Sequence, residues 1–267
     1  MDDSHKVTVP ELARMKTRGE AVVMLTAYDA SFASLIDAAG VDCVLVGDSL
    51  GNVIQGRDST LPVTVDDMAY HVSAVARGLQ RALLIGDLPF LSYHDHRSAM
   101  RSAGALMRAG AEMVKLEGGS AVVPVVKALV EQGVPVCGHL GLTPQHVHRL
   151  GGYRVQGRDE ALASAMKSDA RALVEAGAGM LVLECVPTAL AGEIAGSLSI
   201  PVIGIGAGDE VDGQVLVLYD VLGISGGHRP RFVKDFMTDS GSIPAALSAY
   251  AEAVRQHRFP GAEHAYT

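Results

Sequence analysis

The sequence predicts one (β/α)8 TIM barrel with an N-terminal helix, occupying residues 1–267 as a single domain. Short apolar runs alternate with helical patterns along the chain, which favours a parallel sheet. Eight such runs in 267 residues match the usual size of this barrel. No linker or low-complexity segment divides the chain. A doubly wound open sheet is the alternative, but it would gather its site at one switch point and not at every strand end.

The first element is expected to be a helix from Thr8 towards Gly19, because Thr8, Pro10 and Glu11 supply an N-cap, an early proline and a capping-box glutamate. Such a helix can close the floor of a barrel. The predicted strands cover residues 21–26, 41–46, 82–85, 112–116, 134–138, 180–183, 200–205 and 215–218.

Each predicted strand except the last is expected to be followed by a helix. Asp29 caps the first of these and Gly40 stops it. Later helices are expected at residues 66–77, 95–108, 121–132, before Gly177, after Pro187 and at 244–256. Two long loops, residues 50–65 and 140–158, interrupt the pattern.

Bulk composition narrows the function classes. The chain carries 22 basic and 30 acidic side chains, a formal charge of −8, which argues against a nucleic-acid surface. No apolar run approaches the roughly 20 residues of a membrane helix, and the start has no signal-peptide core. Cys43, Cys137 and Cys185 are too widely spaced for a CxxC metal site or a disulfide framework. We expect a cytoplasmic protein without nucleic-acid or membrane partners.

Polar residues close most of the predicted strands, and the carboxyl ends of barrel strands meet at one mouth. Burying so many ionisable groups is costly unless they are paired or bound to metal, so core packing does not explain the set. The set consists of Asp48, Ser49, Asp87, Lys115, Glu117, His139 and Glu184, with glycines at 204, 206 and 208.

Asp48 and Asp87 are hard oxygen ligands at adjacent strand ends, and together they suit Mg²⁺, which commonly takes one or two carboxylates plus water and substrate. Either aspartate alone could instead cap the following helix. Glu117 could ligate the same metal directly or through water. Mn²⁺ and Co²⁺ accept similar ligands.

Lys115 and Glu117 lie two positions apart on a strand and therefore face the same way. Lys115 could hold a substrate carboxylate, form a Schiff base or pair with a neighbouring acid. Glu184 ends an apolar strand and could act as a general base, or as a partner of Lys115. His139 could donate to an oxyanion or be a structural histidine.

Two further motifs resemble a phosphate loop and a metal site, but the residues around them argue against both. Residues 204–208 (Gly-Ile-Gly-Ala-Gly) lack the spacing and lysine of phosphate loops, and two acids follow them, so we expect glycines that let the backbone approach the pocket. His94 and His96 would point apart on a helix, so we expect a solvated helix start and not a metal site.

Seven motifs resemble one family, that of ketopantoate hydroxymethyltransferase. The similarity extends over about residues 7 to 258. The motifs lie at residues 26–29 (Thr-Ala-Tyr-Asp), 46–49 (Val-Gly-Asp-Ser), 56–68 with Thr-Leu-Pro-Val-Thr, 86–90 (Gly-Asp-Leu-Pro-Phe), 114–118 (Val-Lys-Leu-Glu-Gly), 138–144 (Gly-His-Leu-Gly-Leu-Thr-Pro) and 204–214.

The resemblance implies a Mg²⁺-binding barrel that transfers a one-carbon unit from 5,10-methylenetetrahydrofolate to 3-methyl-2-oxobutanoate. The product would be 2-dehydropantoate, in pantothenate (coenzyme A) biosynthesis. It also implies a large homo-oligomer, often a decamer. The metal would be held by Asp48 and Asp87 with Glu117 nearby. Glu184 would be the base. The oxoacid would contact Asp48, Ser49, Asp87, Lys115 and His139.

The chemistry agrees with the residue types. A 2-oxoacid can chelate Mg²⁺ through its carboxylate and keto oxygens, and the metal then stabilises an enolate. Glu184 would remove the proton from C3, and the loops at 50–65 and 140–158 could close over the site.

One alternative is another Mg²⁺-dependent enolate-forming barrel enzyme, similar to phosphoenolpyruvate mutase or isocitrate lyase, although the cysteine-bearing loop of the lyases is absent. The other is a non-catalytic metabolite-binding subunit.

Overall fold

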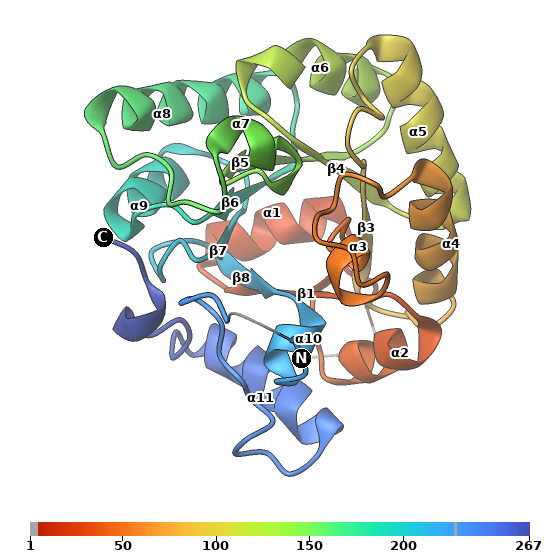
Figure 1. The fold of residues 1–267 in the computed structure, drawn as a ribbon, viewed down its shortest axis with the longest axis vertical. Helices are drawn as coiled ribbons and strands as arrows, with labels where there is room; N and C mark the ends of the chain where they lie inside the picture. Colours follow the sequence, from red (N-terminus) through yellow and green to blue (C-terminus); the bar gives the residue numbers. More distant parts are fainter. Residues whose placement is uncertain (1–4, 227–228) are drawn as a thin grey trace.

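The computed structural model describes residues 5–226 and 229–267, and its centre is a closed barrel of eight parallel strands (Figure 1). The strands pair in chain order and β8 closes on β1. This confirms the predicted fold class and excludes the open sheet. The strands are β1 (Val22–Thr26), β2 (Cys43–Val46), β3 (Leu83–Asp87), β4 (Met113–Glu117), β5 (Val136–Gly141), β6 (Met180–Glu184), β7 (Val202–Ile205) and β8 (Gly213–Leu216).

The longer helices surround the barrel, as Figure 1 shows. They are α2 (Ala30–Ala38), α4 (Val65–Ala76), α5 (His96–Ala109), α6 (Val123–Glu131), α8 (Glu160–Glu175), α9 (Thr188–Ser197) and α11 (Ile243–Arg255). All lie within two residues of the predicted positions where bounds were given. Shorter segments are α3 (Leu50–Val53), α7 (Val147–Leu150), α10 (Leu218–Val221) and the 3-10 turns Ser120–Val122, Pro144–His146 and Ala262–His264. Both long loops therefore contain short helical turns.

The connection from β7 to β8 corrects one prediction. No helix lies between these strands; residues 206–212 make the return alone. The return packs directly on β7, because a Cβ at Gly204 would lie 3.0 Å from Val211 Cγ2. The return is also shorter than the dozen or so residues that a helical crossover needs.

The eighth strand begins two residues earlier than predicted, at Gly213 and not at Val215. Gly213 and Gln214 do not read as an apolar run, which hid the strand start. The glycine is required by packing, because a Cβ on it would lie 2.1 Å from the Val22 carbonyl oxygen of β1.

The helix α1 (Val9–Arg18) forms as predicted, with Thr8 as N-cap and Gly19 in the left-handed conformation as C-cap. It lies across the floor of the barrel. The backbone N–H of Val7, just before it, donates to the Arg81 carbonyl ahead of β3 at 2.8 Å. Gly179, ahead of β6, would bring a Cβ within 3.2 Å of Val9. The helix thus covers the amino ends of the strands.

Three acids on the floor share one arrangement: each directly precedes a strand, accepts a backbone N–H from the neighbouring strand and pairs with a cation. Asp42 accepts from Val23 at 3.0 Å, Glu112 from Leu84 at 3.1 Å and Asp212 from Val202 at 2.8 Å. Their cationic partners are Arg81 at 3.1 Å and Arg255 at 3.4 Å for Asp42, Lys6 at 2.7 Å for Glu112 and Lys16 at 2.5 Å for Asp212.

Burial shows where the barrel opens. Every residue of β1 to β4, β7 and β8 is buried, as expected for a parallel barrel. The exceptions in the other two strands are Gly141 and Glu184, each at a carboxyl end. The mouth therefore lies at the carboxyl ends, where the candidate residues were predicted to meet.

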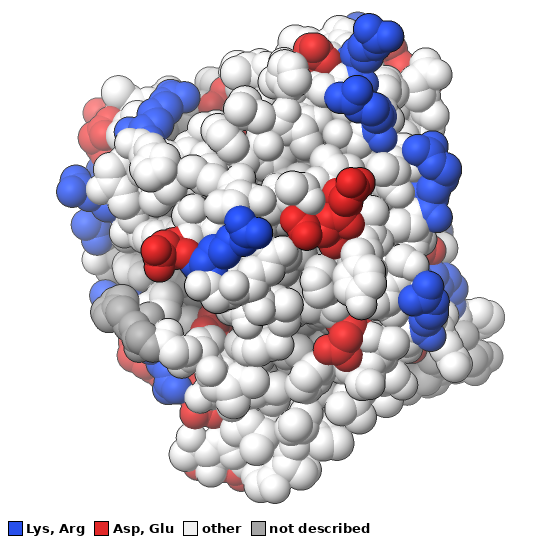
Figure 2. All heavy atoms as spheres, turned by 45° about the vertical axis from the view of Figure 1, so that its right-hand side comes forward, with Lys and Arg blue, Asp and Glu red and all other residues white. Residues whose placement is uncertain are grey.

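The outer surface mixes both charges. On the face that Figure 2 shows, acidic and basic side chains stand among wide uncharged areas. Among residues 5–226 and 229–267, no helix has both the length and the apolar character needed to cross a membrane.

Candidate active site

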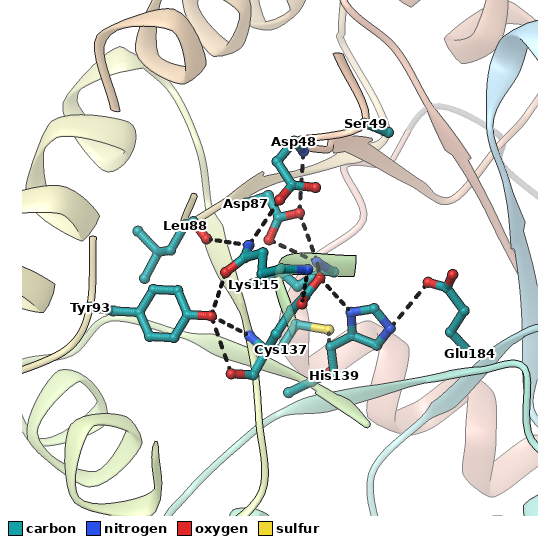
Figure 3. A network of polar contacts seen from close by, with 12 residues as sticks. Asp48, Ser49, Asp87, Leu88, Tyr93, Lys115, Cys137, His139 and Glu184 are labelled. Atoms are coloured by element: carbon teal, nitrogen blue, oxygen red, sulfur yellow. Dashed lines mark hydrogen bonds and ion pairs between the residues drawn. The ribbon is translucent and has the colours of Figure 1, made fainter. Parts of the chain in front are cut away.

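The strand register brings the predicted residues side by side. Asp87 stands opposite Lys115, Glu117 opposite His139, and Gly141 opposite Glu184. Figure 3 shows the side chains of Asp87, Lys115, His139 and Glu184 close to one another. All the predicted site residues line one cavity of about 700 Å³: Asp48, Ser49, Asp87, Lys115, Glu117, His139 and Glu184. All but Ser49 and Glu184 are buried.

Lys115 pairs with Asp87. Its Nζ lies 2.8 and 2.7 Å from the two carboxylate oxygens of Asp87 and 3.9 Å from Glu117 Oε1. Burial alone would lower the pKa of Lys115, but the surrounding carboxylates, led by Asp87 and Glu117, raise it well above its ordinary value. Lys115 is therefore a permanent cation and is not poised to form a Schiff base. The salt bridge that the sequence left open is the observed arrangement.

His139 lies between two carboxylates. Its Nδ1 is 3.4 Å from Glu117 Oε1, and its Nε2 is 3.3 Å from Glu184 Oε2. Neither contact has good hydrogen-bond geometry. Burial and Lys115 would lower the pKa of His139, but the contacts with Glu117 and Glu184 outweigh them and raise it to about 9. His139 is thus positively charged at neutral pH, and it, not Lys115, is the partner of Glu184.

Asp48 and Asp87 lie next to each other: the backbone N–H of Asp48 donates to Asp87 Oδ2 at 3.3 Å. Burial, followed by the charges of Asp87 and Glu117, raises the pKa of Asp48 well above its usual range. Burial also raises the pKa of Asp87, although Lys115 opposes it. Excess negative charge of this kind is relieved by a bound cation.

The donor set fits Mg²⁺ held by one or two carboxylates and completed by water and substrate. Across residues 5–226 and 229–267 no group of three or more His, Cys, Asp or Glu side chains gathers as a complete protein metal site. Glu117 is already engaged, because its Oε2 accepts from the Gln145 backbone N–H at 3.0 Å and its Oε1 faces His139. Burial would raise the pKa of Glu117, but His139 and Lys115 lower it. Its contact with metal stays a prediction.

Ser49 lies at the start of α3, and its side chain makes no helix-capping bond. Its Oγ is 2.8 Å from the Tyr28 hydroxyl, which burial keeps protonated by raising the Tyr28 pKa. Ser49 lines the cavity, where its hydroxyl can reach an oxygen of a bound acid.

The sequence interpretation missed Gln145 and Tyr93. The Gln145 amide nitrogen donates to Asp48 Oδ2 at 2.9 Å and to the Leu88 carbonyl at 3.0 Å, and its amide oxygen accepts from the Tyr93 hydroxyl at 2.6 Å. A flipped amide would set its oxygen against two acceptors, so its orientation is fixed. The network holds one oxygen of Asp48 in place. Gln145 directly follows the 138–144 motif but has no periodic signal that marks a role.

Both long loops contribute to the cavity. Asn52, Val53 and Thr60 come from the first, and Leu142, Pro144, Tyr153, Arg154 and Val155 from the second. The opposite wall includes Asp220, Phe232 and Tyr266, none of which the sequence singled out. Closure of the loops stays a prediction.

The weaker motifs behave as expected. Gly206 has a φ of +62°, and a Cβ on it would lie 2.8 Å from Phe232 and 3.1 Å from Tyr266, so the glycine permits close backbone approach. The N–H of Thr188 donates to the Tyr266 carbonyl at 3.0 Å and fixes the last residues at the same place. Asp95 caps α5, with His94 exposed beside it.

Similarity to known proteins identifies the family to which this chain belongs. The family model for ketopantoate hydroxymethyltransferase matches residues 6–262. The chain belongs to the ketopantoate hydroxymethyltransferase family. A 3-methyl-2-oxobutanoate hydroxymethyltransferase from Xanthomonas euvesicatoria pv. vesicatoria (strain 85-10) is 58% identical over 265 residues, covering 99% of this chain and 97% of the relative. Membership in the ketopantoate hydroxymethyltransferase family makes the chain a transferase enzyme.

Solved structures with a similar fold belong to other enzymes. Phosphonopyruvate hydrolase in complex with oxalate and Mg²⁺ gives a TM-score of 0.61 at 12% identity, covering 78% of this chain and 80% of that one. A 2,3-dimethylmalate lyase of the PEP mutase/isocitrate lyase superfamily gives 0.56 at 17% identity, covering 78% and 80%. At these identities the likeness establishes only that this member of the ketopantoate hydroxymethyltransferase family shares their fold.

Proposed function

We propose that this protein transfers a hydroxymethyl group from 5,10-methylenetetrahydrofolate to 3-methyl-2-oxobutanoate, giving 2-dehydropantoate for pantothenate synthesis. The observation that carries the proposal is the cluster of Asp48, Asp87, Lys115, His139 and Glu184, buried except for the partly exposed Glu184, at the mouth of a barrel of this family. The cluster combines a site for a divalent cation, two fixed positive charges and a carboxylate open to the cavity.

Asp48 and Asp87 would hold Mg²⁺. When bound, the ion would withdraw electrons from the keto and carboxylate oxygens of the oxoacid and so make its C3 proton more acidic. Gln145 leaves one oxygen of Asp48 free for this purpose. Lys115 lies beside Asp87 and supplies a positive charge for the substrate carboxylate, which the Ser49 hydroxyl can also reach.

Glu184 is the base. Its side chain is 15% exposed and lines the cavity, whereas Asp48, Asp87 and Glu117 are engaged deeper in the site. His139 holds the carboxylate from behind at 3.3 Å. Glu184 takes the proton from C3, and the resulting enolate forms a carbon–carbon bond with the methylene carbon of the folate. One water molecule supplies the hydroxyl oxygen while the bonds from that carbon to N5 and N10 break, and tetrahydrofolate leaves; the C3 proton and the two hydrogens of the water end on N5, N10 and the new hydroxyl. The two loops keep bulk water from the enolate.

Hydrogen–deuterium exchange at C3 of 3-methyl-2-oxobutanoate tests this function. In D₂O with Mg²⁺ and without folate, we expect the wild-type protein to catalyse exchange that EDTA abolishes, and product to form only after 5,10-methylenetetrahydrofolate is added. No Mg²⁺-dependent exchange would leave a non-catalytic subunit as the better description. Exchange without folate-dependent product would favour another enolate-forming barrel enzyme, as in the superfamily of the structural neighbours.

The cytoplasmic location and the homo-oligomer, up to a decamer, are part of the same proposal, since they follow from the family resemblance. Sedimentation analysis of the purified protein tests the assembly, and a monomer would contradict it.

A further inference from the structure

The cavity is larger than the oxoacid requires. Its volume of about 700 Å³ is in the range that holds a drug-sized ligand. The charged cluster occupies the side formed by β2 to β6. The rest of the cavity lies against the ends of β7, β8 and β1, where Ile205, Val215 and Leu216 supply an apolar wall. This part of the cavity has no role in the steps assigned to the charged cluster.

One acid lines this second half. Asp220, in α10, lines the cavity, and among the described residues only the Ser225 hydroxyl donates to its carboxylate, to Oδ1 at 2.5 Å. Within the described part of the chain no ion pair involves Asp220, in contrast to the acids of the floor. Burial raises the pKa of Asp220 and outweighs the Ser225 hydrogen bond and the charge of Arg229, which lower it, so the carboxylate gains from a donor that enters the cavity.

The position of Asp220 relates it to the reaction centre. The backbone N–H of Leu218, at the start of α10, donates to Thr26 Oγ1 at the end of β1, at 3.0 Å. The negative charge of Asp220 contributes to the raised pKa of Tyr28, whose hydroxyl contacts Ser49. A ligand on Asp220 therefore lies in the same cavity as a substrate held at Ser49 and Lys115.

We propose that Asp220 is the recognition residue of a pterin subsite for the folate co-substrate. The aminopyrimidinone edge of a pterin presents a ring N–H and an amino group side by side, and a carboxylate accepts both in a bidentate pair. This inference rests on the proposed function, because it names the place where the one-carbon donor binds.

The surroundings suit a flat ring with an anionic tail. Phe232 and Tyr266 line the cavity beside the apolar wall, and aromatic side chains pack favourably against a bicyclic ring. Arg154 and Arg231 also line the cavity, and Arg231 lies 5.9 Å from the centre of the Tyr266 ring. Guanidinium groups at this position can bind the carboxylates of the folate glutamate.

The first experiment measures Asp220→Asn. The variant replaces one acceptor by a donor, so we expect KM for 5,10-methylenetetrahydrofolate to rise about 10- to 100-fold. Folate-independent C3 exchange and its dependence on oxoacid concentration should stay unchanged. Asp209→Asn is the matched control, because Asp209 is an exposed acid near the mouth that does not line the cavity, and its KM for folate should stay at the wild-type value.

The second experiment uses a donor without the pterin amino group, 2-desamino-5,10-methylenetetrahydrofolate. Wild-type protein should use it with a KM raised about 10-fold or more, whereas Asp220→Asn should discriminate between the two donors less than 3-fold. An unchanged folate KM in Asp220→Asn, or equal discrimination by both proteins, overturns the subsite. Loss of exchange in wild-type protein would instead refute the proposed function, so the two failures are distinct.

Discussion

The two ends of the barrel use carboxylates in opposite ways. On the floor, Asp42, Glu112 and Asp212 each accept a backbone N–H and face a Lys or Arg. At the mouth, the acids outnumber the cations, and the pKa of Asp48 is raised by burial and by its acidic neighbours. The same chemical group therefore stabilises the fold at one end and stores unbalanced charge for a ligand at the other. Five substitutions test this contrast.

The largest effect is expected at the mouth. Glu184→Gln keeps the shape of the side chain but removes the base, so C3 exchange and turnover should fall about 10²- to 10⁴-fold. The melting temperature should change by less than about 3 °C, because Glu184 is not part of a stabilising pair on the floor. Measured exchange at the wild-type rate would remove Glu184 from its role as base.

The floor should show the reverse. Asp42→Ala leaves the Val23 N–H without an acceptor and Arg81 without its carboxylate, at a cost of about 3 kcal/mol. The melting temperature should drop by about 6–12 °C. The kcat of the folded variant at a lower temperature should match wild type. A large loss of kcat without unfolding would show that the two ends are coupled.

Two buried tyrosine hydroxyls have different tasks: one holds a residue of the site, and the other bonds only the backbone of the barrel. The Tyr93 hydroxyl fixes the amide that holds Asp48, whereas the Tyr250 hydroxyl bonds the Met24 and Gln214 carbonyls at 2.8 and 3.1 Å. Each change to Phe should cost about 1–2 kcal/mol. Only Tyr93→Phe should weaken Mg²⁺ binding, by about 10-fold in calorimetry. Equal Mg²⁺ affinity in both variants would contradict a role for Gln145 in holding Asp48.

The smallest effect is expected for an exposed ion pair. It tests whether burial, and not position on the floor, decides how much an ion pair contributes to the free energy of unfolding. Arg14 pairs with Glu11 on α1 at 2.5 Å, but its side chain is 60% exposed. Arg14→Ala should change the free energy of unfolding by less than about 0.5 kcal/mol in a denaturant titration. A loss close to that of Asp42→Ala would mean that exposure does not decide the strength of these pairs.

The sequence predicts the barrel and the convergence of the site because both follow from periodicity: apolar runs end in Asp48, Asp87, Glu117 and Glu184, and barrel topology brings such ends together. It does not predict which side chains pair. Lys115 binds Asp87, and His139 faces Glu184, because of distances across strands that sequence spacing does not encode.

Other features were missed for identifiable reasons. Gln145 and Tyr93 lie outside the regular strands and helices, where no periodicity distinguishes a buried polar residue from a surface one. The seventh connection and the start of β8 were misjudged because Gly213 and Gln214 look like a turn. In the sequence Asp42 only interrupts the apolar run at 41–46, and its position directly ahead of a strand, shared with Glu112 and Asp212, becomes visible once the strand bounds are known.

The place of Tyr266 has a practical consequence for anyone who purifies or labels this enzyme. Its carbonyl is held by Thr188, and its side chain lines the cavity, so a tag fused after Thr267 would attach next to the reaction chamber. Val7, by contrast, is bonded to Arg81 on the floor. A label attached beside Val7 would therefore lie at the floor, away from the cavity, whereas a carboxy-terminal tag would disturb the kinetics.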